Sequence, residues 1–152
     1  RPVYGHGLVY IATGFQQPVL IAVRVDGEGD VTKTHTVWTL RRSVPYTPSP
    51  LLVGDELYLV SDIGIATCLD ATTGEIRWQR RLGGNFSASP VFADGRIYFQ
   101  SEDGMTTIIA PGKEFRPLAT NTLDGWTLGS MAISGGSVYL RTDSGLYRIG
   151  AR

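Results

Sequence analysis

Three aromatic residues recur in glycine-, proline- and serine-rich segments, at nearly the same distance before an apolar run that contains a tyrosine. Tyr46 lies in RSVPYTPSP, Phe86 in GGNFSASP and Trp126 in DGWTLGSM, which places them 12, 12 and 13 residues before that tyrosine. Aromatic rings aligned on loops can bind a peptide strand, a sugar or a flat ring. We therefore predict a ligand-binding surface made of Tyr46, Asn85, Phe86 and Trp126. The alternative is that the rings pack between structural elements.

Acidic residues recur in short segments that end in glycine: SDIG (61–64), SEDG (101–104) and TDSG (142–145). Such segments suit tight hairpins with a positive φ angle at the glycine. Their carboxylates should lie on one face of the molecule. A Ca²⁺ site or a cationic partner is one interpretation, and turn chemistry alone is the other. The acidic residues are Asp62, Glu102, Asp103 and Asp143.

The remaining residues that could take part in catalysis or bind a metal do not form a recognisable catalytic or metal-binding set. His6 and His35 have no Cys, Asp or Glu at metal-ligand spacing, so we interpret them as exposed turn and strand residues. HExxH and GxSxG motifs are absent, and GEGDVT (27–32) lacks the third glycine of a dinucleotide-binding loop. The single cysteine, Cys68, excludes an internal disulfide and a thiol pair. We expect a non-enzymatic protein without a metal or a cofactor.

The amino-acid composition limits the classes of partner that the chain is expected to bind. The chain has 152 residues, with 14 Lys+Arg and 14 Asp+Glu, so its net charge is zero. No strong electrostatic field favours nucleic acid or an anionic membrane. No apolar run approaches the roughly 20 residues of a membrane span. The first residues, RPVYGHGLVY, lack the features of a signal peptide and resemble the middle of a longer protein.

The elements that position these residues repeat along the chain. The runs GLVYI, ELYLV, RIYFQ and SVYLR look like one strand written four times, and no window keeps the helical period of 3.6. Their tyrosines are separated by 48, 40 and 41 residues. A period near 40 in an all-strand sequence indicates a β-propeller or a similar array. The tyrosines are Tyr10, Tyr58, Tyr98 and Tyr139.

Each repeat contains four strand-like runs separated by turns, as in one propeller blade. We therefore predict an all-β fold, a β-propeller segment of four-stranded antiparallel blades within a single partial domain, 1–152. Three blades are complete and a fourth has three strands. The blades cover approximately residues 2–42, 48–82, 89–123 and 130–150.

The turn after the third strand of the second repeat carries a family motif. CLDATTGEIRW, from Cys68 to Trp78, has an Asp two residues after a small residue, then Thr-Gly, then a Trp four residues after the Gly. Asp70 and Thr73 can accept turn amides, and Gly74 supplies positive φ. Trp78 can pack against the neighbouring blade. The segment resembles the repeat motif of the pyrroloquinoline-quinone (PQQ)-like β-propellers, with Cys68 in place of the usual Ala, and we assign it a structural role.

The resemblance extends over the chain as repeats, but only one full motif is present. The first repeat keeps an Asp26–Gly27 turn and Trp38, and the third has APGKEF (110–115) without a Trp. PQQ enzymes use adjacent cysteines, a stacking Trp and Glu, Asn and Asp ligands to Ca²⁺, and this chain cannot supply the cysteine pair. Exported relatives include the scaffold lipoprotein of outer-membrane barrel assembly, which implies a periplasmic or exported location.

The resemblance implies a non-catalytic scaffold or recognition module. In propeller topology the loops entering the blades and the acidic hairpins open on one face around the central channel, here named the channel face. A protein or peptide is the expected ligand of this face. The alternative is a fragment of a PQQ-dependent dehydrogenase or of a carbohydrate-active propeller enzyme.

Closure of the propeller is a further expectation. Three and three-quarter blades fall below the four to eight of closed propellers, so we expect part of a larger propeller of seven or eight blades. By itself the chain should form an open arc. Its two flanks would be covered by the remaining blades of the parent propeller or by a second copy of the chain.

Overall fold

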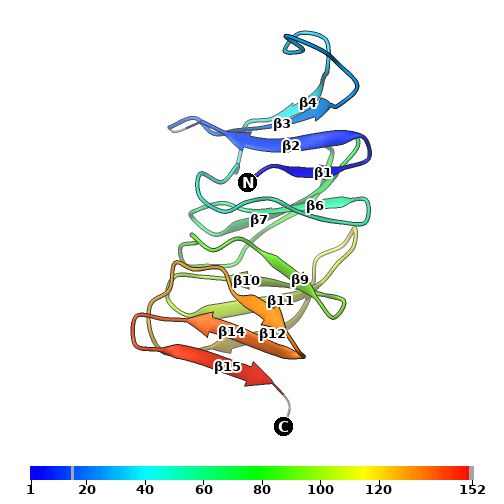
Figure 1. Cartoon of the computed structure of the whole chain (residues 1–152). Helices are drawn as coiled ribbons and strands as arrows, with labels where there is room; N and C mark the ends of the chain where they lie inside the picture. The colour runs from blue at the N-terminus through cyan, green and yellow to red at the C-terminus, as the bar shows by residue number, and fades with distance from the viewer. Residues whose placement is uncertain (15, 151–152) are drawn as a thin grey trace.

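The structure is a computed structural model and describes residues 1–14 and 16–150. The described residues form fifteen strands and no helix. Four antiparallel sheets follow one another along the chain, and each is built from consecutive strands (Figure 1). Three sheets have four strands and the last has three. The predicted fold class, an all-β propeller segment of this composition, is confirmed.

The four sheets are numbered here as blades 1 to 4. Blade 1 contains β1 (Val3–Gly5), β2 (Leu8–Thr13), β3 (Val19–Arg24) and β4 (Thr36–Leu40). Blade 2 contains β5 (Leu51–Val53), β6 (Glu56–Val60), β7 (Ile65–Asp70) and β8 (Ile76–Arg81). Blade 3 contains β9 (Val91–Ala93), β10 (Arg96–Gln100), β11 (Met105–Ala110) and β12 (Arg116–Thr122). Blade 4 contains β13 (Ala132–Ser134), β14 (Ser137–Arg141) and β15 (Leu146–Gly150).

The repeated tyrosine lies on the blade face that packs against the next blade. Tyr58 on β6 pairs with Cys68 on β7, and Cys68 pairs with Trp78 on β8. Because directly paired residues share one face of a sheet, the small Cys68 lies between two aromatic side chains. This arrangement gives a physical reason for the small residue in the motif. The equivalent residues of blade 1 are Tyr10, Ala22 and Trp38.

The hydrophobic cores lie between successive blades. Alternate residues of each strand point to opposite faces, so one blade contributes to two cores. Blade 2 turns Leu57, Leu59 and Leu69 toward blade 1, and Tyr58 and Trp78 toward blade 3. Every interface is therefore built from side chains of two different repeats.

Trp78 joins blade 2 to the turn that follows β11 in blade 3. Its side chain is 7% exposed, and the indole Nε1–H donates to the carbonyl oxygen of Gly112 at 3.2 Å. The ring meets Phe115 edge-on, with 5.1 Å between ring centroids. The Gly112 amide also donates to the hydroxyl of Tyr58 at 2.7 Å. One turn of blade 3 is thus held by two aromatic residues of blade 2.

Trp38, the tryptophan that the first repeat keeps, makes the same connection from blade 1 to blade 2. Its indole Nε1–H donates to the carbonyl oxygen of Ala71 at 3.0 Å. The ring lies over Gly74, where a Cβ atom would approach it to 2.6 Å. Gly74 has a φ of 74°, so both the backbone and the neighbouring ring require glycine.

The motif turn itself is closed by Asp70 and Thr73. One carboxylate oxygen of Asp70 accepts the amides of Thr72 and Thr73, each at 3.0 Å. The Thr73 hydroxyl accepts the Glu75 amide at 3.3 Å. Arg77 donates to the other Asp70 oxygen at 2.6 Å. These bonds hold the turn in the shape that receives Trp38.

Replacing Trp78 with alanine removes the packing on Phe115 and the indole donor to Gly112. We expect the free energy of unfolding to fall by about 3–5 kcal/mol, the range for truncation of a buried aromatic residue. Urea unfolding followed by circular dichroism measures the change. Trp126→Ala removes a half-exposed ring and is the matched control, with an expected change of about 0.5 kcal/mol or less. An unfolding curve that Trp78→Ala leaves unchanged would contradict a stabilising role for this contact.

Asp70 should make the free energy of unfolding depend on pH in the acidic range. The Thr72 hydroxyl, followed by the turn amides and Arg77, holds the pKa of the Asp70 carboxyl well below its usual range. A carboxyl with a lowered folded-state pKa stabilises the fold above its unfolded pKa of about 3.9, and this contribution is lost as the pH falls below about 5. Asp70→Asn should therefore reduce stability at pH 7 and flatten the acid limb of a stability–pH curve. Asp55→Asn, at a side chain that is 78% exposed, is the control. An acid limb as steep in Asp70→Asn as in the parent chain would contradict the prediction.

Candidate functional site

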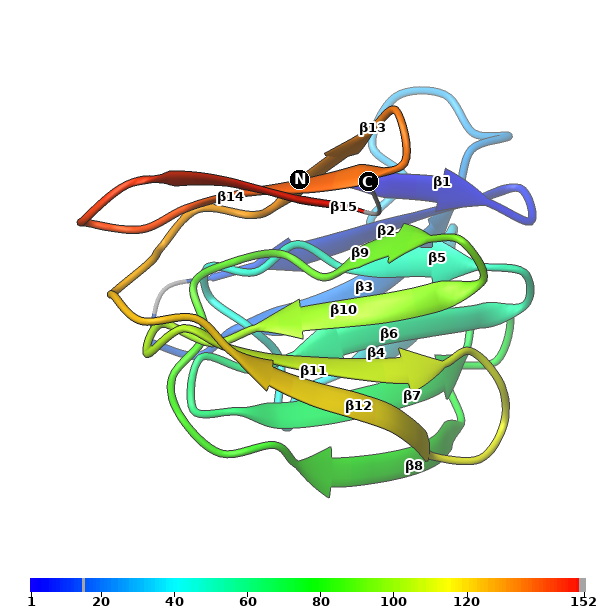
Figure 2. The ribbon, with the colours of Figure 1, turned by 90° about the horizontal axis from the view of Figure 1, so that it is seen from below.

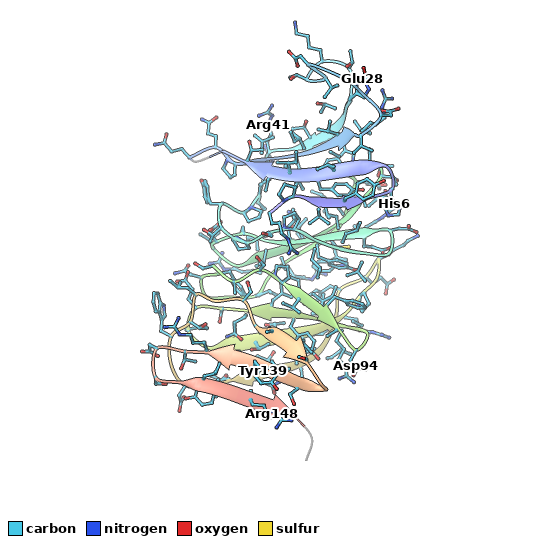
Figure 3. The ribbon with its side chains drawn as sticks, in the orientation of Figure 1. His6, Glu28, Arg41, Asp94, Tyr139 and Arg148 are labelled. Atoms are coloured by element: carbon cyan, nitrogen blue, oxygen red, sulfur yellow. The ribbon has the colours of Figure 1, made fainter. Side chains whose placement is uncertain are left out.

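The loops that enter blades 2, 3 and 4 lie on the same side of the molecule as the acidic hairpins (Figure 2). The turns on the opposite side are marked by His6, between β1 and β2, and Asp94, between β9 and β10 (Figure 3). The channel face therefore includes six segments that belong to blades 2, 3 and 4. These segments are residues 43–50, 83–90 and 124–131, and the hairpins 61–64, 101–104 and 142–145.

The acidic hairpins hold the entering loops in place. The Asp62 carboxylate accepts the amide of Tyr46 at 2.7 Å and that of Thr47 at 3.2 Å. In blade 4 the Asp143 carboxylate accepts the amide of Trp126 at 2.9 Å. Because these oxygens are occupied by backbone donors of their own blade, the geometry favours the interpretation as turn and loop chemistry.

Blade 3 uses a longer acidic side chain for the same purpose. The Glu102 carboxylate accepts the hydroxyl of Ser87 at 2.6 Å. Asp103 accepts the hydroxyl of Ser101 within its own hairpin. Among residues 1–14 and 16–150, no three His, Cys, Asp or Glu side chains are grouped so that they could hold a metal ion.

The repeated backbone bonds correct the predicted equivalence of Trp126 and Phe86. The Glu102 amide donates to the carbonyl oxygen of Asn85, and the Asp143 amide donates to that of Trp126, both at 2.8 Å. Trp126 therefore occupies the place of Asn85, one residue earlier than Phe86. The extra residue in its 13-residue spacing was the signal in the sequence.

Thr127 occupies the place of Phe86. The Phe86 amide donates to the carbonyl oxygen of Asp62 in the preceding blade, and the Thr127 amide donates to that of Glu102, both at 2.9 Å. Sequence reasoning missed Thr127, because a threonine attracts less attention than the tryptophan beside it. Aligning the loops by their hairpins, and not by the following tyrosine, would have found it.

Phe86 does not present its ring to a ligand, which corrects the prediction for this residue. The side chain is 1% exposed and packs in the core between blades 2 and 3. A ring carbon lies 3.1 Å from the position that a Cβ atom of Gly64 would take, and the carbonyl oxygens of Gly83 and Gly84 lie closer still. Asn85, beside Phe86, is exposed.

Tyr46 and Trp126 are each 51% exposed and line two separate pockets on the channel face. The pocket at Tyr46 has a volume of about 520 Å³ and lies between blades 1 and 2. The Tyr46 hydroxyl donates to the carbonyl oxygen of Gln16, so the ring bridges the β2–β3 hairpin and the loop that enters blade 2. The other lining residues include Pro18, Arg41, Asp62 and Ile63.

The pocket at Trp126 has a volume of about 320 Å³ and belongs to blade 4 alone. Thr127 and Leu128 of the entering loop form one side of it. Arg141, at the end of β14, and Asp143 in the hairpin form the other side. The predicted row of rings is thus two pockets with a packed core between them.

The residues present do not fit a PQQ site. Cys68 is fully buried between blades 2 and 3, and its thiol lies 3.7 Å from the Gly112 carbonyl oxygen. Burial raises the pKa of the Cys68 thiol to about 12, which keeps it protonated and unreactive at neutral pH. His6 is bonded through its ring to the carbonyl oxygen of Gly54 in the β5–β6 turn of blade 2, and His35 to the hydroxyl of its neighbour Thr34.

Comparison with known protein families identifies the family of this chain. A family model described as the outer membrane protein assembly factor BamB matches residues 27–111, just over half of the sequence. The chain belongs to the BamB family. This confirms the resemblance to the PQQ-like propellers. Comparison with curated protein sequences gives no significant match.

Solved structures show the same fold. BamB from Moraxella catarrhalis matches 95% of the chain with a TM-score of 0.69 and 16% sequence identity. The chain spans 40% of the length of that BamB. No helix in the described part of the chain has the length and apolarity that a membrane crossing needs.

Two enzymes share the architecture. A europium-containing methanol dehydrogenase matches 80% of the chain and 24% of its own length, with a TM-score of 0.63 and 11% identity. Glutaminyl cyclase from Myxococcus xanthus matches 98% of the chain and 64% of its own length, with a TM-score of 0.60 and 15% identity. At these identities the likeness concerns the fold and not the activity.

Proposed function

We propose that the chain is a non-catalytic BamB-family scaffold that binds an extended segment of a protein partner on its channel face. The observation that carries this proposal is the open pocket between blades 1 and 2, whose rim bears Tyr46 and Ile63. Their side chains are 51% and 61% exposed. Large apolar side chains at a concave surface are typical of protein-binding sites.

The pocket is held rigid without a ligand. Asp62 binds the amides of Tyr46 and Thr47, and the Tyr46 hydroxyl contacts the neighbouring hairpin at Gln16. Because the loop is already ordered, a peptide would bind with a smaller entropic cost. Arg41 adds a cation to the pocket wall. An aromatic ring, an aliphatic side chain and a charged group together suit a polypeptide of mixed sequence.

The family supports a protein as the partner class. BamB is described as an outer membrane protein assembly factor, and this description supports our proposal of a periplasmic or exported setting for the chain. The function of a full-length relative extends over more chain than these 152 residues.

The open face of blade 1 supports the proposal that further blades or a second copy cover it. Tyr4 pairs with Val9, and Val9 pairs with Val23, so these three side chains share the face turned away from blade 2. Ile11 and Ile21 pair directly on the same face. Tyr4 is 65% exposed, and an apolar sheet face of this kind is ordinarily buried.

Peptide selection followed by mapping tests the proposed function. Random 12-residue peptides displayed on phage are selected on the chain, and the selected peptides are titrated while backbone amides are followed by NMR. We expect shifts at Tyr46, Thr47 and Ile63, because the pocket between blades 1 and 2 is rigid and apolar. Tyr46→Ala and Ile63→Ala should each weaken binding about tenfold, as for central interface residues.

Tyr4→Ala is the matched control, since it removes an exposed tyrosine from the open face of blade 1. It should leave the affinity unchanged. Selection of no peptide, or shifts confined to the side of the molecule marked by His6 and Asp94, would contradict the proposal.

A further inference from the structure

Blade 4 contains a pocket that blades 2 and 3 do not form in the same way. Its distinguishing residue is Thr127, which stands where blade 3 has Phe86. Phe86 fills the core between two blades, and a threonine fills much less volume. Thr127 also lines a pocket of about 320 Å³ in blade 4.

The Thr127 hydroxyl is buried without a partner. The residue is 3% exposed, and its Oγ1 atom has no hydrogen-bond partner among the residues the structure describes. Buried hydroxyls are nearly always hydrogen-bonded, because leaving one unpaired costs free energy. A ligand in the pocket that bonds to Oγ1 would remove that cost.

Arg141 brings a cation to the same pocket. It stands at the place of Gln100 in blade 3, which is 2% exposed and is bonded within its own blade to Thr106. Arg141 is exposed and forms no ion pair with any residue of the described ranges. Asp143, the carboxylate that lines the pocket, is bonded to the Trp126 amide. The guanidinium is therefore available to an external acceptor.

The remaining wall is apolar. Trp126 is 51% exposed and Leu128 is 47% exposed, and both line the pocket. An arginine fork and a hydroxyl provide donors for two oxygens of one carboxylate. An indole ring and an aliphatic chain provide a surface for an apolar group next to it.

We propose that the blade 4 pocket binds a carboxylate that carries an apolar neighbour. Arg141 and the Thr127 hydroxyl bind the carboxylate oxygens, and Trp126 packs against the adjoining group. The carboxylate of a peptide terminus and that of a uronic acid have the same chemistry. The site uses none of the residues of the pocket between blades 1 and 2, so each proposal can fail without the other.

NMR titration tests the site with defined probes. N-acetyl-leucine offers a carboxylate beside an isobutyl group, its amide removes the charge, and glucuronate presents the carboxylate on a sugar. We expect N-acetyl-leucine to shift the indole N–H of Trp126 and the side-chain N–H of Arg141, and its amide to shift neither. If only N-acetyl-leucine shifts these signals, the ligand of the pocket is a peptide carboxylate. If glucuronate shifts them as well, the pocket binds carboxylates in general.

Substitutions that introduce the residues found at the equivalent positions of blade 3 provide the second part of the test. Thr127→Phe should fill the pocket, and Arg141→Gln should remove the cation, with a loss of about tenfold or more in affinity in each case. Thr127→Val keeps the shape without the hydroxyl and should weaken binding while leaving the fold intact. Arg116→Gln, on the exposed strand β12, is the matched control. Equal responses to N-acetyl-leucine and its amide, no response to any probe, or unchanged binding in both Arg141→Gln and Thr127→Val would overturn the proposal.

Discussion

The bond between a tryptophan indole and the turn of the following blade is the interaction on which the array depends. Within the described residues, every strand finds its ladder partners inside its own blade, so side-chain contacts and a few loop hydrogen bonds, such as that from the Phe86 amide to the Asp62 carbonyl oxygen, hold one sheet against the next. Trp38 donates to the Ala71 carbonyl of blade 2, and Trp78 donates to the Gly112 carbonyl of blade 3. Each indole combines a large apolar surface with one directed hydrogen bond, which fixes both the distance and the register of two blades.

Departures from the repeat are concentrated where binding is proposed. The outer strand of blade 3, β12, has no tryptophan, and Leu118 in it is 48% exposed. The loop that follows carries Thr127 in place of the buried Phe86. A regular repeat fills its interfaces with its own side chains, and the smaller Thr127 lines the pocket of blade 4. The channel face is therefore a rigid frame, fastened by Asp62, Glu102 and Asp143, with openings at irregular positions.

The sequence predicts the repeated parts of the structure well, because strand alternation and turn chemistry are local. The tyrosine strands and the Asp70–Gly74 turn follow from residue types alone, whereas the place of the small Cys68 opposite Tyr58 comes from the strand register. The Phe86 loop is bonded to the Asp62 hairpin of the preceding blade, and no local sequence pattern predicts which loop meets which hairpin. The place of Trp126 depends on one inserted residue, whose position within the loop the spacing does not specify.

Hydrogen exchange of the three indole N–H groups tests the central claim most directly. The chain contains three tryptophans, so each indole gives its own NMR signal. Bonding to the next blade should protect the N–H of Trp38 and Trp78, and the half-exposed Trp126 should exchange at a rate close to that of free indole. Protection of the first two that is lost only on unfolding is the predicted result. Equal and rapid exchange of all three would contradict the account, because the blades would then be held together by other contacts.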